Sequence, residues 1–381
     1  MCYQSAPLGT RRFSGAPPFA VLMYGWPIHD LIQEKDRLMR MKARFIGLSV
    51  FLVLASVGWV GAWTFLSAKA DEAFEKAIVT ASAQGQQLEC TERQTFGFPF
   101  RLAISCEDLS LELDNGLKVA TAGMSAQAFV YRPNHQVVSF TSPATIRLGK
   151  LGNVLLTWEK ARLGSELTLS GVEAATARME GAKLRPVNPV PELVGTSVTS
   201  QRLLMSARRT AANEPKDSLV AGAQAQNLEV TGKAFTLPAM DFSALVLAYD
   251  MAPLFENRVR NPLRFWISKG GAADIQVMRI QSEDTRVHVA GWVKLDNNGF
   301  WNADLNVDSA NLSAFIKRLG PELDQIKTVG GAIAGLVEQL GTPSTIDEQE
   351  ARRIKISIRK GFVQVGFVPV GTIPQIDVSK L

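Results

Sequence analysis

An uncharged apolar run from Phe45 to Ala68, FIGLSVFLVLASVGWVGAWTFLSA, places the strongest limit on what this chain of 381 residues can fold into. A helix of about 24 residues is long enough to cross a hydrocarbon core about 30 Å thick. The run therefore predicts a transmembrane signal-anchor over residues 41–68. Two alternatives remain open: a signal sequence cleaved after Ala70, because Ala68-Lys69-Ala70 resembles a signal-peptidase site, and a buried helix of a soluble protein.

Charges on the two sides of the run predict its orientation. The segment after it mixes both signs, whereas five basic residues lie before it, namely Lys35, Arg37, Arg40, Lys42 and Arg44. The positive-inside bias predicts a single pass through the inner membrane over residues 45–68, with the N-terminus cytoplasmic and the chain after Ala70 periplasmic. Translation could start at Met41 instead of Met1, so we expect residues 1–40 to be a disordered tail or a mis-annotated N-terminal extension.

The net charge argues against nucleic acid as a partner. The chain carries 41 Lys and Arg residues against 36 Asp and Glu residues, a net charge of +5, and the residues up to Arg44 account for +4 of it. The rest of the chain is almost neutral, whereas a nucleic-acid-binding domain needs a basic face.

Hydrophobic periodicity changes after the anchor from that of a helix to that of strands. Residues 69–84 repeat apolar side chains every three or four positions, which predicts a helical stalk. Beyond it, apolar and polar residues alternate and end in turn residues, as in Leu109–Leu113 before Gly116 and Val289–Leu295 before Asp296–Gly299. This pattern predicts a β-dominated fold, mainly antiparallel with curved sheets and a few packed helices, after one N-terminal transmembrane helix.

Two candidate breaks divide the strand-rich part of the sequence, the proline-rich Arg185–Pro191 and the polar, turn-prone Asn213–Asp217. Arg185–Pro191 contains three prolines, which is unsuitable for a central strand. We therefore expect a first β-rich part over residues 85–185 and a second over residues 192–381. Helical periodicity predicts helices near residues 253–268 and 312–340 within the second part, the latter docked on a sheet by its apolar face.

No catalytic or metal-binding motif stands out in the sequence. The three histidines, His29, His135 and His288, share no short spacing, and nucleophile, zinc-protease and phosphate-loop motifs are lacking. We expect no catalytic, cofactor-binding or metal-ligating residues, no cofactor, and a protein that is not an enzyme. A hydrolase whose residues converge over long sequence distances is the alternative.

Two of the three cysteines, Cys90 and Cys106, lie symmetrically about residue 98. If Phe96–Pro99 forms the turn of an antiparallel hairpin, these cysteines fall opposite one another, near enough for a disulfide in an oxidising compartment. Two reduced, buried thiols are the alternative. Cys2 precedes the anchor and is expected on the far side of the membrane.

Two groups of glycine, proline and aromatic residues resemble a known family. The first is Gly97-Phe98-Pro99-Phe100-Arg101-Leu102, and the second is Gly361-Phe-Val-Gln-Val-Gly366-Phe-Val-Pro369-Val-Gly371-Thr-Ile-Pro374. Together with the anchor and the hairpin Gly291–Gly299, they resemble a bacterial family of single-anchor envelope proteins, domain of unknown function 2125. The resemblance implies no catalytic residues. A looser similarity of architecture to AsmA-like envelope proteins implies an association with lipid movement between membranes.

We therefore expect a non-enzymatic, inner-membrane-anchored periplasmic protein that binds lipid or another apolar ligand in a groove of its sheet and serves envelope maintenance. The alternative is a structural or assembly factor that binds another envelope protein through a strand edge.

Overall fold

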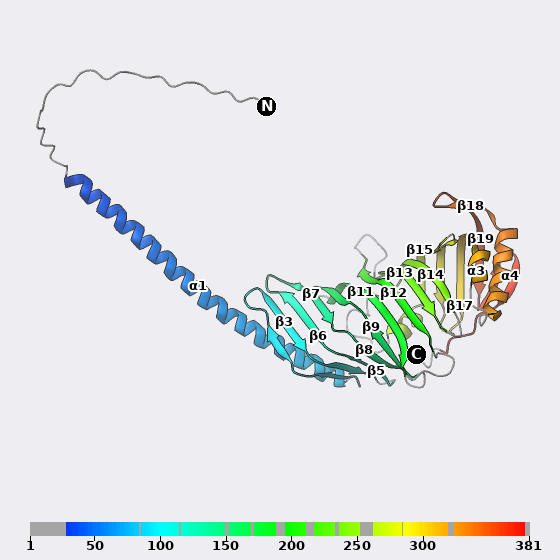
Figure 1. The fold of residues 1–381 in the computed structure, drawn as a ribbon, viewed down its shortest axis with the longest axis horizontal. Helices are drawn as coiled ribbons and strands as arrows, with labels where there is room; N and C mark the ends of the chain where they lie inside the picture. The colour runs from blue at the N-terminus through cyan, green and yellow to red at the C-terminus, as the bar shows by residue number, and fades with distance from the viewer. Residues whose placement is uncertain are drawn as a thin grey trace, which may run out of the picture. The chain divides into compact units, whose positions relative to one another are not determined.

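The computed structural model describes residues 28–83, 85–113, 116–148, 152–168, 171–187, 195–210, 217–232, 236–251, 262–283, 285–318 and 324–377. These residues form four helices and twenty-one strands (Figure 1). The chain divides into two compact units, Met1–Ala62 and Trp63–Leu381. The β-dominated fold predicted from the alternating pattern is confirmed, because all strand pairs are antiparallel members of one sheet.

The four helices are α1 (Ile28–Ala83), α2 (Pro262–Ser268), α3 (Leu312–Arg318) and α4 (Asp324–Leu340). Helix α1 begins at Ile28, within the segment for which we expected a disordered tail or an extension; residues 1–27 lie outside the described residues. Leu, Met, Glu, Lys and Arg dominate Ile32–Lys42, and these residues favour helix. Of the helix predicted near residues 253–268, the part before Pro262 lies outside the described residues.

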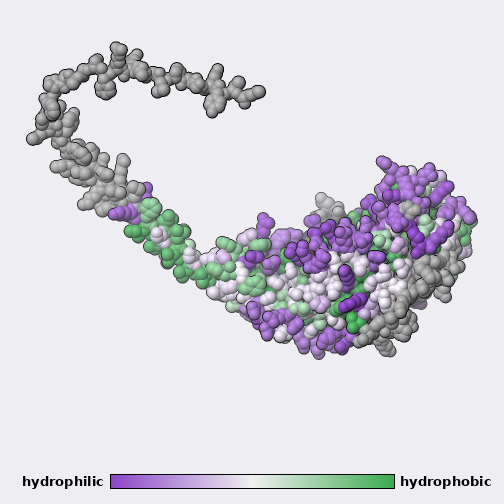
Figure 2. All heavy atoms as spheres, viewed as in Figure 1, coloured by the Kyte–Doolittle hydropathy of each residue, from purple (hydrophilic) through white to green (hydrophobic). Residues whose placement is uncertain are grey.

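The first unit contains the N-terminal part of α1. Its side chains from Arg44 to Ala62 are exposed, and the helix over Arg44–Ala83 is long and apolar enough to cross a membrane. Figure 2 shows this segment as a band of hydrophobic residues. One candidate membrane-spanning helix is therefore present, as the apolar run predicts.

From β10 to β17 each strand pairs with the next one along the chain, as in a meander, whereas many strands before β10 pair with strands further away in the sequence. Their bounds are β1 (Gln87–Cys90), β2 (Gln94–Phe96), β3 (Arg101–Cys106), β4 (Leu109–Glu112), β5 (Leu117–Thr121), β6 (Met124–Phe129), β7 (Arg132–Phe140), β8 (Ala144–Leu148), β9 (Asn153–Thr157), β10 (Lys160–Thr168), β11 (Gly171–Val187), β12 (Ser197–Arg209), β13 (Leu219–Thr231), β14 (Leu237–Ala248), β15 (Ala272–Ser282), β16 (Thr285–Leu295), β17 (Trp301–Ala310), β18 (Thr342–Ile346), β19 (Gln349–Arg359), β20 (Phe362–Val365) and β21 (Val368–Thr372). The hairpins predicted around Gly116 and Asp296–Gly299 are the pairs β4–β5 and β16–β17.

Two branches of the sheet diverge from β11. The first half of β11 pairs with β10 and its second half with β9. One branch continues from β10 through β7, β6 and β3 to β2, and the other from β9 through β8, β5 and β4 to β1. On its other edge β11 pairs with β12, so the sheet continues between the two β-rich parts expected from the sequence.

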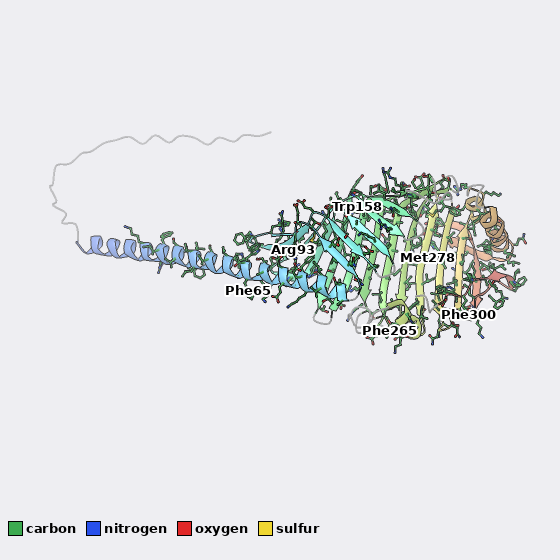
Figure 3. The ribbon with its side chains drawn as sticks, turned by 90° about the horizontal axis from the view of Figure 1, so that it is seen from below. Phe65, Arg93, Trp158, Phe265, Met278 and Phe300 are labelled. Atoms are coloured by element: carbon green, nitrogen blue, oxygen red, sulfur yellow. A yellow bond between two sulfur atoms is a disulfide. The ribbon has the colours of Figure 1, made fainter. Side chains whose placement is uncertain are left out.

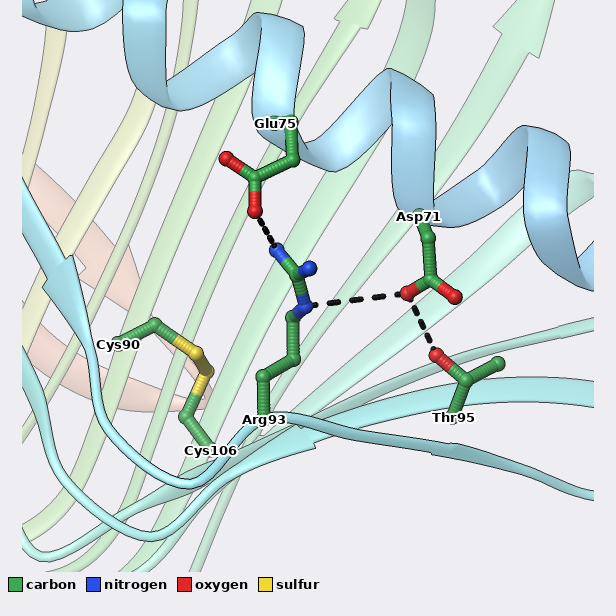
Figure 4. Close-up of a disulfide and its surroundings, with 6 residues drawn as sticks. All are labelled: Asp71, Glu75, Cys90, Arg93, Thr95 and Cys106. Carbon is green, nitrogen blue, oxygen red and sulfur yellow. Dashed lines mark hydrogen bonds and ion pairs between the residues drawn. A yellow bond between two sulfur atoms is a disulfide. The ribbon is translucent and has the colours of Figure 1, made fainter.

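A disulfide between Cys90 and Cys106 joins β1, the last strand of one branch, to β3, the next-to-last strand of the other (Figure 4). Cys90 ends β1 and Cys106 ends β3, and their Cα atoms are 5.4 Å apart. Their symmetry about residue 98 predicted that the two cysteines are direct strand partners. They are not, because Cys90 pairs with Leu109 and Phe96 pairs with Ala103. The hairpin is centred between Pro99 and Phe100 instead, and the disulfide spans the bend between β1 and β2.

Helices cover parts of the sheet near its two ends. Arg93, just before β2, bonds Glu75 of α1 at 2.5 Å, and Thr95 Oγ1 donates to Asp71 Oδ1 at 2.7 Å (Figure 4). At the other end, Ile333, Leu336 and Val337 of α4 pack with Leu312 of α3 on side chains of β17 and β19, including Val307 and Ile354. The described part of the predicted 312–340 helix thus docks on the sheet.

We expect Cys90→Ser or Cys106→Ser to lower the free energy of unfolding by about 3 kcal/mol, because the disulfide closes a loop with a sequence separation of 16. Urea unfolding of the full chain in detergent, followed by tryptophan fluorescence, measures the loss. Reduction of the wild-type protein should reproduce it. Cys2→Ser is the control and should leave the midpoint unchanged, whereas equal stability of oxidised and reduced wild type would contradict the prediction.

Candidate functional site: an apolar face of the sheet

One row of direct strand partners runs across twelve strands and is apolar throughout. Each of these side chains lies on the same face, because residues directly opposite in neighbouring strands point the same way. We name this set the apolar row; from β3 to β19 it consists of Ile104, Ala126, Val138, Leu163, Ala177, Met205, Ala223, Ala244, Met278, Val289, Val307 and Ile354.

A second row, two residues away along each strand, broadens this apolar face. Its members from β3 to β16 are Cys106, Met124, Phe140, Ala161, Met179, Leu203, Ala225, Phe242, Ile280 and Val287. Trp158 packs on this row at Phe140, Ala161 and Met179, and its Nε1 donates to Phe140 O at 3.1 Å. The two rows together form a continuous apolar surface.

The neighbouring row on the opposite face of the sheet is polar except for Leu204. The row of direct partners that starts one residue along from Ile104 consists of Ser105, Ser125, Ser139, Arg162, Arg178, Leu204, Gln224, Ser243, Arg279, His288, Asp308 and Arg353. Antiparallel sheets commonly have one solvated and one covered face. This sheet therefore has a face suited to water and a face that requires an apolar cover.

Helices cover the apolar row at its two ends. Val307 and Ile354 are buried beneath α4, and Val289 packs against the same cluster. At the other end Thr95, the direct partner of Ile104, is bonded to α1. Between these ends Leu163 and Met205 are 37% and 60% exposed, although apolar side chains flank both.

The uncovered middle of the row is long enough for an extended apolar ligand. From Val138 of β7 to Met278 of β15 it includes seven strands, and the six spacings between them, at about 4.8 Å each, amount to about 29 Å. Met278 lies in the middle of the sheet in Figure 3. Three alanines, Ala177, Ala223 and Ala244, lie between the larger side chains and leave space above the sheet.

An ion-pair network on the polar face includes Asp304 of β17. Ser357 Oγ donates to its Oδ1 at 2.7 Å, Arg359 Nη2 donates to its Oδ2 at 2.8 Å, and Lys355 Nζ lies 3.5 Å away. The hydrogen bonds from Arg359 and Ser357 lower the pKa of Asp304 to about 2. Arg359 also lies over the Trp292 ring, 5.6 Å from its centroid.

A shallow depression of about 570 Å³ lies on the bend between β1 and β2, lined in part by Glu92, Glu107, Asp108 and Ser125. A hydrogen bond with Glu92 raises the pKa of Glu107. Among the described residues, no group of three or more His, Cys, Asp or Glu side chains could hold a metal ion.

The structure places the two family motifs at opposite ends of the sheet (Figure 1). Gly97 has a φ of +111°, and a Cβ there would lie 2.8 Å from Arg101 O, so the first turn requires glycine. Gly361, with a φ of +82°, forms the turn between β19 and β20 and accepts a hydrogen bond from Ile373 N. Gly366, Pro369, Gly371 and Pro374 lie in or next to β20 and β21.

Sequence reasoning missed the apolar row. Alternation within single strands identified strands, but none of the residues in the row was predicted as a site. The signal that existed was local: in β11 and β12 the alanines, Met179, Leu203 and Met205 recur at every second position. It did not indicate which strands are neighbours.

The described fold is that of an antiparallel, β-dominated protein with one candidate membrane helix. A family described as uncharacterized protein conserved in bacteria (DUF2125) matches residues 63–374. Because this match covers most of the chain, the protein belongs to that family, as the two motifs indicated. No curated protein matches the chain. The similarity to AsmA-like envelope proteins stays a prediction.

We expect Asp304→Asn to lower the free energy of unfolding by about 1 to 2 kcal/mol at neutral pH, because the pKa of Asp304 is depressed and its partners are partly solvated. The stabilisation is present above the ordinary pKa of 3.8 and is lost as the pH falls toward about 2. Urea unfolding across this range should show the difference between wild type and variant disappear.

Asp347→Asn is the matched control, since Asp347 is exposed and its contacts with Arg286 and His288 are 3.9 and 4.0 Å long. It should change stability little at any pH. A deficit of Asp304→Asn that stays constant down to the lowest pH would contradict the assigned ion pair.

Proposed function

We propose that this protein is a non-enzymatic, single-pass inner-membrane protein whose periplasmic sheet binds the acyl chains of lipids along the apolar row. The observation that carries the proposal is the row itself: twelve apolar direct partners, covered by helices at both ends and exposed at Leu163 and Met205 between them. Exposed apolar side chains within such a row favour an interaction site.

Shape and size favour an acyl chain as the occupant. One acyl chain spans about half of a bilayer hydrocarbon core that is about 30 Å thick, so the uncovered stretch of about 29 Å is long enough for a fully extended acyl chain along the row. The small side chains of Ala177, Ala223 and Ala244 leave room for a ligand on the sheet. The apolar side chains of Leu163, Met205 and Met278 lie around them, and methionine in particular adapts its shape to a chain of methylenes.

The anchor favours the same occupant. Residues Trp63–Ala68 belong both to the apolar run and to the unit that contains the sheet, so the sheet is connected directly to the predicted membrane span. The positive-inside bias supports a periplasmic sheet, and the disulfide between Cys90 and Cys106 suits an oxidising compartment.

Met205→Glu tests the proposal in the full chain reconstituted into vesicles containing phosphatidylcholine with a photoreactive diazirine on its acyl chain. After irradiation and proteolysis, lipid adducts are quantified by mass spectrometry. We expect adducts on the wild-type sheet peptides that contain Leu163, Met205 or Met278. Met205→Glu should reduce them at least about tenfold, because a carboxylate is costly to bury against an acyl chain.

Two controls accompany this experiment. Adducts on peptides from residues 45–68 report on the bilayer and should be equal in all proteins. Ser206→Glu is the matched variant, because its side chain lies one residue further along β12 on the polar face, and it should retain the wild-type adducts. Adducts confined to residues 45–68 in the wild type would contradict the proposal. Capture of a protein, without lipid, by a benzophenone at position 205 would assign the face to an envelope protein instead.

A further inference from the structure

Exposed aromatic side chains gather in two turns at one end of the sheet. Phe96 ends β2, and Phe98 and Phe100 lie in the turn between β2 and β3; Phe129 ends β6, and Tyr131 lies in the turn between β6 and β7. Phe98 is 52% and Tyr131 is 67% exposed. We name these five residues the aromatic tip. Exposure of large apolar rings to water is unfavourable in free energy, and a cluster of exposed rings is typical of a surface that binds a partner.

The two turns form one surface. Val130 N donates a hydrogen bond to Phe100 O at 3.0 Å, and Phe129 is the direct partner of Arg101. The rings of Phe129 and Tyr131 are stacked, with 5.2 Å between their centroids. The backbone of the sheet therefore holds the aromatic rings of both turns together.

This surface contacts Trp63, the first residue of the unit that contains the sheet. Trp63 Nε1 donates to Arg101 O at 3.0 Å, and the Trp63 ring meets the Phe98 ring edge to face at 5.6 Å between centroids. Trp63 lies within the apolar run of residues 45–68, as does Phe65, whose side chain is exposed on α1 (Figure 3). Trp is enriched where a membrane span meets the interface, which favours an interfacial depth for Trp63 and for the Phe98 ring that it touches.

The charges around the aromatic tip suit phospholipid headgroups. Arg101 and Arg132 are exposed, and both are direct partners of Phe129. The sequence contains no acidic residue between Glu92 and Glu107 or between Asp114 and Glu159. Guanidinium groups bind phosphate, and Trp and Tyr favour the boundary between headgroups and acyl chains.

We propose that the aromatic tip docks on the phospholipid bilayer that holds the anchor, with its rings at the boundary between headgroups and acyl chains. The inference rests on the membrane anchor of the proposed function, and it is independent of what the apolar row binds. Ile104, the first residue of that row, lies on β3, which begins at Arg101 of the tip. The docked bilayer therefore adjoins the start of the apolar row.

Spin labels at Phe98→Cys and Tyr131→Cys test this docking in the full chain with Cys2→Ser, reconstituted into vesicles of phosphatidylcholine and phosphatidylglycerol. Electron paramagnetic resonance measures the collision rates of each label with oxygen, which partitions into the bilayer, and with a water-soluble nickel chelate. Phe367→Cys is the matched control, because Phe367 is 73% exposed in the turn between β20 and β21. We expect the ratio of oxygen to nickel collisions at both tip positions to exceed that at position 367 several-fold.

Equal ratios at positions 98, 131 and 367 would overturn the inference. Phe100→Cys, in the same turn, replaces either tip position if a labelled variant loses the wild-type unfolding midpoint. The result is separable from that of the diazirine experiment. Lipid adducts on the sheet with a water-accessible tip would leave the proposed function standing without the docking, and a shielded tip without sheet adducts would do the reverse.

Discussion

Antiparallel hydrogen bonding between successive strands is the constraint on which the rest of this structure depends. It sets residues such as Leu163, Ala177 and Met205 directly opposite one another, and the two-residue period of a strand then sends all of them to one face. A slip of one residue at any pair would move apolar side chains to the solvated face and arginines to the other. The register therefore creates the apolar row and its polar counterpart together.

The apolar face of a sheet must be covered from water by other parts of the chain or by a partner. Helix α4 covers the row at β17 and β19 with Val337 and Ile333, and α1 is bonded to the first strands through Asp71 and Glu75. The disulfide keeps the two branches of the sheet joined where they end near α1. These contacts fix the two ends, and in the proposed function the stretch between them takes a ligand whose own surface is apolar.

The lipid proposal and the docking proposal are linked by one chain segment. Trp63 belongs to the apolar run, contacts the turn that contains Phe98, and precedes the stalk that is bonded to β2. An acyl chain bound along the row and a tip at the bilayer interface would lie on one continuous apolar surface. Glycine at Gly97 permits the tight turn that presents Phe98 and Phe100, which gives the first family motif a physical reason.

Local patterns in the sequence by themselves determined the candidate membrane helix at Phe45–Ala68, the β-dominated class, and the hairpins around Gly116 and Asp296–Gly299, because each depends only on residues near in the chain. The disulfide was predicted, but not its register, since the centre of the turn depends on how residues 97–100 pack. Only the tertiary structure decided that Ile104 and Ile354 belong to one row. Alternation tells which residues share the face of a strand, whereas strand neighbours and their register are set by pairing between distant parts of the chain.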